Sequence, residues 1–268
     1  MKIIVSHDVD HLFWSEHLFK DLYIPKHILR SLKWWLTGGA GFSDFYKSIS
    51  KFGNDRLHRL PELIAFNKDH KVPATFFVGV NQGLGLSYAT AAAREISLWL
   101  ARQGETVGVH GIDFDTQEKV DAEFGTFKDF DTSLSFGVRM HYLRSDEKTL
   151  TLLSKAGYTY DSTVYGLEPP TLVDKMWEFP ISLMESFLWR EAGLGKDKML
   201  NAAKERLDKA QGLGLPYFVI DFHDVNFDDA TSFFKAWYQS FIAYLVQQKF
   251  EFVNFHQAVN ELNQHKSI

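Results

Sequence analysis

The chain opens on an apolar run that ends in two aspartates and two histidines, His7-Asp8-Val9-Asp10-His11. Because side chains alternate along a strand, Asp8 and Asp10 point to one face of it. Two neighbouring carboxylates repel each other and lose hydration, and a cation or a shared proton between them relieves that repulsion. The pair is therefore a candidate metal or acid–base site. A turn or a helix-capping pair is the alternative that these two residues alone leave open.

Titratable residues also follow several later strand-like runs, in residues 108–115, 137–144, 160–163 and 221–224. In an α/β barrel the carboxyl ends of the strands lie on one rim, where active sites form. Their joint occurrence predicts one site lined by all of these segments. Asp221, one strand period before His223, is expected to orient that imidazole. A buried core histidine is the alternative interpretation of His223.

The elements that must position these residues alternate between strand and helix patterns. Strands are predicted at residues 3–6, 74–80, 106–109, 136–139, 158–161, 177–180, 217–222 and 252–255, and helices at 60–70, 88–103, 145–156, 196–211, 230–248 and 256–263. This alternation indicates an α/β fold with a parallel sheet. About eight strands favour a closed or nearly closed barrel over an open sheet. No glycine-rich phosphate loop follows the first strand, so a nucleotide-binding fold has little support.

Residues 12–54 interrupt this alternation. The segment is aromatic, locally basic and helical in pattern, and it is too long for an ordinary connection, which indicates a functional excursion or a lid. Most of its aromatic side chains, Phe19 among them, are predicted to anchor it on the barrel. Trp34 and Trp35 are the expected exceptions and could stack on sugar rings. A membrane-surface helix is disfavoured by the interspersed acidic residues.

The composition restricts the class of protein. With 268 residues, a single α/β domain over residues 1–268 is expected. The formal charge of −5 argues against a nucleic-acid partner. Because the chain has no cysteine, disulfides and thiolate chemistry are excluded, and His, Asp and Glu are the available metal ligands. The chain starts in a strand without a signal-like segment, and no apolar run approaches the ~20 residues of a membrane span. A cytoplasmic protein is therefore expected.

The order of these motifs resembles the polysaccharide deacetylase superfamily, the NodB-homology fold of carbohydrate esterase family four, in a divergent branch. The resemblance rests on residues 74–77 (Ala-Thr-Phe-Phe), 107–111 (Val-Gly-Val-His-Gly) and 222–224 (Phe-His-Asp), which are similar to the second strand, the histidine motif and the last motif of that family. It runs from residue 1 to about residue 259. The resemblance implies a distorted (β/α)7 barrel.

The resemblance also implies a role for each site residue. Asp8 resembles the catalytic base, His223 the catalytic acid, and Arg139 the arginine that holds the base in place. Asp10 and His110 resemble metal ligands. In such enzymes a divalent metal polarises the acetyl carbonyl and a water molecule. The implied function is removal of acetyl groups from an acetylated sugar of a bacterial polysaccharide or its precursor.

The sequence departs from the family at one metal ligand. The second histidine, expected four residues after His110, is replaced by Phe114. Asp113, Asp115 and His141 are candidate replacements, and Asp113 is taken as the expected third ligand. Helix capping is the alternative for the two aspartates. Zinc is the expected ion, but a second carboxylate ligand would shift the preference toward manganese or magnesium.

Two further functions stay open. A non-catalytic glycan-binding barrel would explain the loss of a ligand at Phe114, because the metal would then be absent. A hydrolase that cleaves a C–N bond in a small cyclic amide would keep the chemistry. A narrow pocket under residues 12–54 would favour the cyclic amide, and an open groove would favour a polymer. Arg144 and Asp161 either bind substrate or pair with each other.

Overall fold

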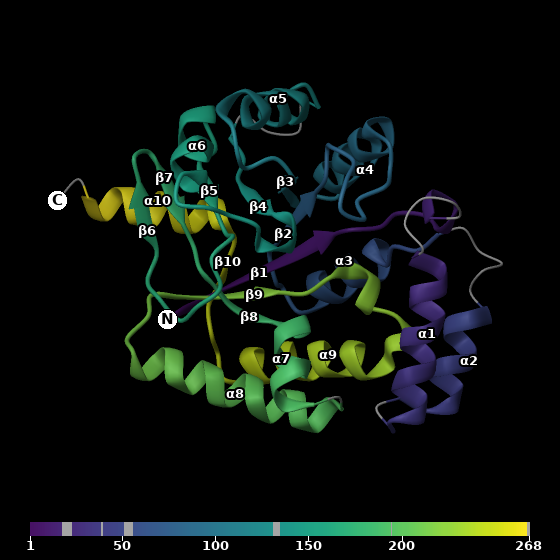
Figure 1. The fold of residues 1–268 in the computed structure, drawn as a ribbon. Coiled ribbons are helices and arrows are strands. Elements are labelled where there is room, and N and C mark those ends of the chain that lie inside the picture. The colour runs from purple at the N-terminus through teal and green to yellow at the C-terminus, as the bar shows by residue number, and fades with distance from the viewer. Residues whose placement is uncertain (18–22, 39, 51–55, 131–134, 194, 267–268) are drawn as a thin grey trace.

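The computed structural model shows a curled sheet surrounded by helices (Figure 1). The structure describes residues 1–17, 23–38, 40–50, 56–130, 135–193 and 195–266. The strands are β1 (Lys2–Val9), β2 (Ala74–Val78), β3 (Thr106–Gly111), β4 (Val138–Met140), β5 (Tyr160–Asp161), β6 (Thr171–Val173), β7 (Met176–Glu178), β8 (Ile181–Met184), β9 (Tyr217–Asp221) and β10 (Phe252–Val253). The helices are α1 (Tyr23–Leu36), α2 (Phe42–Ser50), α3 (Leu60–Asp69), α4 (Thr90–Arg102), α5 (Gln117–Lys128), α6 (Thr149–Ala156), α7 (Glu185–Ala192), α8 (Lys196–Gly212), α9 (Ser232–Gln247) and α10 (Phe255–Lys266).

The barrel closes through a strand that is interrupted in its middle. Parallel pairs connect β5, β4, β3, β2, β1, β9 and β8 in that order. β7 pairs with β5 and β8 pairs with β9, while only Phe179 and Pro180 separate β7 from β8. A parallel bridge between Tyr165 and Ile181 extends the β5 side. β7 and β8 thus form one distorted strand that joins the two sides, and the predicted distorted (β/α)7 barrel is confirmed.

All eight predicted strands are present, although β5 and β10 are only two residues long. The sequence patterns missed β6, β8, α5 and α7. β6 is an edge strand whose side chains are largely exposed, so it has no apolar run to detect. β8 follows Pro180 directly, and a proline within a run weakens a strand assignment. α5 is mostly polar and shows only weak helical periodicity.

β1 is the central strand and pairs with β9 along one edge. Along its other edge, Ile3 and Ile4 pair with β10, and residues 5–9 pair with β2. Its polar residue His7 is fully buried and needs partners for both ring nitrogens. His7 Nδ1 donates to the carbonyl of Phe222 at 2.8 Å, and the amide of Asn67 donates to Nε2 at 3.0 Å. Burial lowers the pKa of His7 to about 4, so the ring is neutral. These contacts hold β1 against β9 and α3, one residue before Asp8.

The excursion at residues 12–54 contributes α1 and α2, which lie side by side next to the barrel (Figure 1). Trp34 packs against Phe233 and Phe234 of α9, with ring centroids 5.3 and 6.0 Å apart, so it anchors α1. Trp35 is 36% exposed and stacks on Phe45 of α2. Phe19 lies outside the described residues. Of the helices that the structure describes, none has the length and apolar character of a membrane span.

The carboxyl group of Glu105, at the start of β3, provides a test of pH-dependent stability. Burial raises its pKa to about 7, although Lys68 Nζ, 4.0 Å from Oε1, acts to lower it. Folding raises the pKa of Glu105 above the ordinary value of 4.5, so the folded protein favours the protonated carboxyl group. The contribution of this group to folding stability is therefore complete below pH 4.5 and is lost as the pH rises through 7. We expect Glu105→Gln to increase the free energy of unfolding by about 1–3 kcal/mol at about pH 8 and little at about pH 4.5.

Urea unfolding at the two pH values measures this effect. Glu251→Gln is the matched control, because Glu251 is 62% exposed and pairs with Lys2 at the surface. An increase in stability of Glu105→Gln that is equal at both pH values would contradict the assignment.

Candidate metal centre and active site

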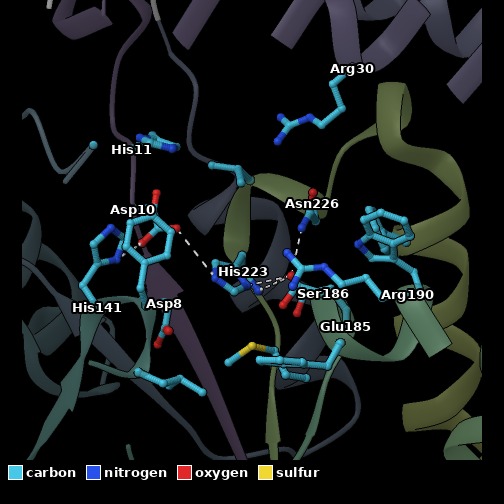
Figure 2. Close-up of a pocket in the computed structure, with 18 of the residues that line it drawn as sticks. Asp8, Asp10, His11, Arg30, His141, Glu185, Ser186, Arg190, His223 and Asn226 are labelled. Carbon is cyan, nitrogen blue, oxygen red and sulfur yellow. Dashed lines mark hydrogen bonds and ion pairs between the residues drawn. The ribbon is translucent and has the colours of Figure 1, made fainter. Parts of the chain in front are cut away.

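A cavity of about 850 Å³ opens where the barrel strands end. Asp8, Asp10, His110 and His223 all line it, and Figure 2 shows Asp8, Asp10 and His223 around the same space. Arg139 lies fully buried beneath it. The structure therefore brings together five of the predicted site residues from the ends of β1, β3, β4 and β9, namely Asp8, Asp10, His110, Arg139 and His223.

Asp10, His110 and His141 present three potential ligand atoms to one point. His110 Nε2 lies 3.2 Å from Asp10 Oδ1 and 2.9 Å from His141 Nδ1. His141 Nδ1 lies 3.4 Å from Asp10 Oδ1. Tetrahedral zinc with bonds of about 2.0–2.1 Å separates its ligand atoms by roughly 3.3 Å. The spacing of these three atoms therefore matches one zinc coordination sphere.

The other nitrogen of each histidine fixes its tautomer. His110 Nδ1 lies 3.0 Å from the carbonyl oxygen of Arg139, and His141 Nε2 lies 3.1 Å from that of Leu84. Because a carbonyl only accepts, these two nitrogens carry the protons. When both rings are neutral, His110 Nε2 and His141 Nδ1 carry no proton, and their lone pairs face each other at 2.9 Å. Carbonyl-oriented histidines of this kind are typical of metal sites.

Asp10 provides an independent test of whether the residues fit a metal. Its Oδ1 atom is buried and makes no hydrogen bond of acceptable geometry. Two lone pairs and a carboxylate oxygen directed at one point are unfavourable unless a cation or a shared proton lies between them. The described residues therefore fit a divalent cation held by one carboxylate and two imidazoles, a set typical of catalytic zinc.

Glycine at position 111, next to His110 on β3, leaves room for the side chain of Met140, which precedes His141 on the neighbouring strand. A Cβ at Gly111 would lie 2.7 Å from Met140 Sδ, which is closer than Cβ atoms come to other heavy atoms in proteins. The backbone turns sharply just after His141, with Tyr142 at φ 57° in the left-handed region. This turn keeps His141 beside His110 instead of continuing β4.

Asp113, the expected third ligand, lies outside this group. Its Oδ2 accepts a hydrogen bond from Asn81 at 2.8 Å. Asp115 is half exposed and pairs with Lys119 at 2.9 Å, as expected of a solvated helix start. Phe114 packs against the core, and the guanidinium of Arg144 lies 4.6 Å from its ring centre. The structure places His141, the third candidate, at the position where Asp113 was expected.

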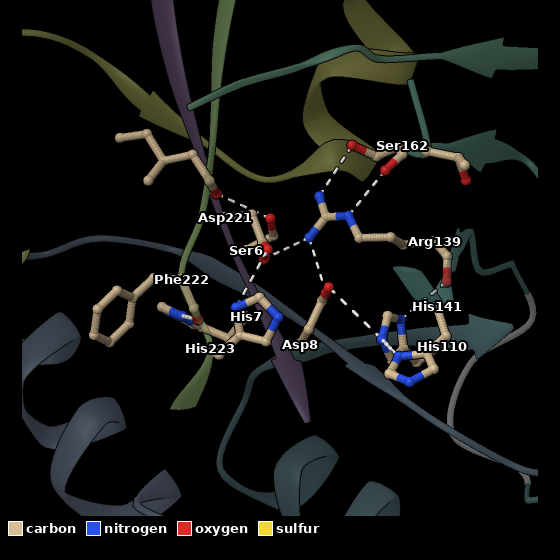
Figure 3. Close-up of polar contacts among 12 residues, drawn as sticks. Ser6, His7, Asp8, His110, Arg139, His141, Ser162, Asp221, Phe222 and His223 are labelled. Carbon is tan, nitrogen blue, oxygen red and sulfur yellow. Dashed lines mark hydrogen bonds and ion pairs between the residues drawn. The ribbon is translucent and has the colours of Figure 1, made fainter. Parts of the chain in front are cut away.

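Arg139 connects the two buried aspartates (Figure 3). Its Nη1 donates to Asp8 Oδ1 at 2.9 Å and to Asp221 Oδ1 at 2.7 Å, and Ser162 accepts from Nε and Nη2 at 2.9 and 3.0 Å. Burial acts to raise the pKa of Asp8, but His110 and Arg139 outweigh it and lower that pKa. Burial and the charge of Asp8 raise the pKa of Asp221 to about 8. At neutral pH Asp8 is therefore ionised and Asp221 is largely protonated.

His223 is oriented by Glu185, a residue that the sequence patterns missed. His223 Nδ1 lies 2.7 Å from Glu185 Oε1 but 3.8 Å from Asp221 Oδ2, so the expected orienting role of Asp221 is secondary. Burial opposes the charged imidazole, but Glu185 outweighs it and raises the pKa of His223 well above its usual value. His223 Nε2 faces the cavity, 3.7 Å from Asp10 Oδ2. His223 is thus protonated and positioned to donate a proton.

Neither predicted role of Arg144 and Asp161 matches their positions. Asp161 is fully buried and accepts hydrogen bonds from the backbone and hydroxyl of Thr163 at 3.0 and 2.8 Å. Arg144 contacts the ring of Phe114. Among the ion pairs of the described residues, none joins Arg144 to Asp161. Asp161 therefore supports the strand ends beneath the site.

Comparison with known proteins identifies the fold. No protein-family model and no curated protein matches the sequence. A Mycobacterium smegmatis protein assigned as a polysaccharide deacetylase superposes with a TM-score of 0.65 and 17% identity over 98% of this chain and 90% of that one. The allantoinase Puue gives 0.63 and 12% over 97% and 88%. A carbohydrate esterase family four pseudoenzyme from Bacillus anthracis gives 0.53 and 10% over 96% and 65%.

These likenesses, together with the ring of strands, show that the chain has the NodB-homology fold of the polysaccharide deacetylases. The predicted resemblance is confirmed at the level of fold. At identities of 10–17%, the likeness is one of fold.

Proposed function

We propose that this protein is a metal-dependent hydrolase that removes an acetyl group from an acetylated sugar of a bacterial polysaccharide or its precursor. The observation that carries the proposal is the convergence of Asp10, His110 and His141 on one point, with both histidine tautomers fixed. An ionised Asp8 and a protonated His223 line the same cavity. A metal centre flanked by a base and an acid is the equipment that amide or ester hydrolysis requires.

Asp10, His110 and His141 would hold the divalent cation, which supplies polarisation of the acetyl carbonyl and of a water molecule. Asp8 Oδ2 lies 3.7 Å from His110 Nε2, beside this group, and takes the proton of the attacking water. Arg139 holds the Asp8 carboxylate in place. As the C–N or C–O bond breaks, His223 gives its Nε2 proton to the leaving nitrogen or oxygen, and acetate is the other product.

The cavity wall supports a second candidate, cleavage of a C–N bond in a small cyclic amide. α1 contributes His27 and Trp34 to the cavity, so the excursion covers part of the site. The fold likeness to an allantoinase agrees with a small substrate. The same metal group and the same acid–base pair would serve this reaction.

Acetate release tests the proposal. We expect the protein loaded with zinc, manganese or magnesium to release acetate from at least one N- or O-acetylated sugar, and to lose this activity with a chelator. The panel includes cyclic amides, scored by ring opening. No turnover of any acetylated sugar by metal-loaded protein would contradict the deacetylase, and ring opening alone would favour the second candidate.

A further inference from the structure

Two arginines line the active-site cavity away from the metal-ligand group. Arg30 comes from α1 and Arg190 from α7. Figure 2 shows Arg190 on the far side of His223 from Asp10 and His141, and Arg30 at the top of the view, above Asn226. The proposed reaction uses neither of them.

The carboxylates that line the same cavity are already engaged. Asp8 pairs with Arg139, and Asp10 faces His110 and His141. Glu185 accepts hydrogen bonds from His223 and from Asn226, the latter at 2.9 Å. None of these three carboxylates forms an ion pair with Arg30 or Arg190.

Arg30 and Arg190 contact rings instead of carboxylates. Arg30 donates to His27 Nδ1 at 3.3 Å, and its guanidinium lies 5.3 Å from the ring centre of Trp34. The Arg190 guanidinium lies 5.7 and 6.0 Å from the ring centres of Phe187 and Trp189. Within the described part of the chain, neither arginine forms an ion pair. Aromatic contacts orient a guanidinium while leaving most of its N–H donors for a ligand.

We infer that the substrate carries an anionic group, a carboxylate or a phosphate, which Arg30 and Arg190 bind while the acetyl group lies at the metal-ligand group. This inference rests on the proposed function and specifies its substrate class. Planar guanidinium groups suit the bidentate binding of carboxylate and phosphate oxygens. A positive wall stands out in a chain whose formal charge is −5, and it would attract an anionic substrate.

Calorimetric binding to the metal-loaded protein tests the inference without requiring turnover. The probes are N-acetylglucosamine, N-acetylglucosamine 1-phosphate and the corresponding N-acetylated aminouronic acid. We expect at least one anionic sugar to bind at least about tenfold more tightly than the neutral sugar. Arg30→Gln or Arg190→Gln should weaken anionic-sugar binding roughly tenfold, and the double variant about 100-fold, with neutral-sugar binding unchanged. Arg94→Gln, at an exposed arginine of α4 outside the cavity, is the matched control.

The probes separate the two anion sources, because preference for the phosphate or for the uronic acid identifies the group recognised. Equal binding of neutral and anionic sugars, or an unchanged double variant, would overturn the inference. Acetate release is followed in parallel. Arginine-dependent anion binding without acetate release would overturn the deacetylase and leave the anion site standing. Equal acetate release from neutral and anionic sugars that does not change when both arginines are replaced would support the deacetylase and overturn the anion site.

Discussion

Replacing His141 with alanine is expected to lower zinc affinity by at least about 100-fold. Even residues that only orient metal ligands change affinity 10- to 100-fold, and His141 Nδ1 is placed as a ligand itself. Without it, Asp10 and His110 form a two-ligand site, whereas catalytic zinc has three protein ligands. Competition with a chromophoric chelator measures the change.

Asp113→Asn is the matched control for this experiment. Asp113 bonds to Asn81 and lies outside the ligand group, so zinc affinity should stay within about threefold of wild type. If Asp113→Asn loses zinc affinity and His141→Ala keeps it, Asp113 is the third ligand, as the sequence led us to expect, and His141 is not.

Asp8→Asn is expected to reduce kcat by about 10²- to 10⁴-fold while the protein keeps its metal. A positioned general base contributes about that factor, and asparagine keeps the shape of the side chain without its basicity. Asp8 is not among the three atoms that converge on the metal position, so its replacement leaves the ligand set intact. Steady-state acetate release and metal content are measured on the same preparation.

Asp221→Asn is the matched control at the other end of Arg139. Because the pKa of Asp221 is raised to about 8, its side chain is largely neutral at pH 7, and asparagine resembles that form. We therefore expect a loss in kcat below about tenfold. A comparable loss in both variants would mean that Asp8 only holds Arg139 in place.

The sequence was sufficient to predict the barrel and the convergence of its strand ends. Side-chain alternation placed Asp8 and Asp10 on one face, and the common rim of a barrel brought His110 and His223 to them. These rules depend only on strand order and direction. They hold for this chain because β1, β3, β4 and β9 all end at the same rim.

The choice of His141 among the three candidate ligands, and the partner of His223, could not be predicted in this way. His141 reaches the metal-ligand group only because the chain turns through a left-handed Tyr142, a conformation that no residue type at that position signals. Asp113 is adjacent in sequence to the vacated histidine position but turns toward Asn81. Glu185 follows directly after β8, and a search for carboxylates at strand ends would have found it had that strand been recognised behind Pro180.

The position of His141 also bears on the non-catalytic alternative. Phe114 removes the usual ligand, but an imidazole from the end of the neighbouring strand faces the same point. A degraded site would leave the remaining ligands without such a partner. The geometry therefore favours a relocated ligand over a lost one.

The most direct measurement is X-ray diffraction from zinc-soaked crystals, with anomalous data collected on both sides of the zinc absorption edge. We expect one anomalous peak about 2.0–2.2 Å from Asp10 Oδ1, His110 Nε2 and His141 Nδ1, with an open coordination position toward the cavity. A zinc-saturated crystal with no peak between these three atoms, or with zinc bound by Asp113 instead of His141, would contradict the account.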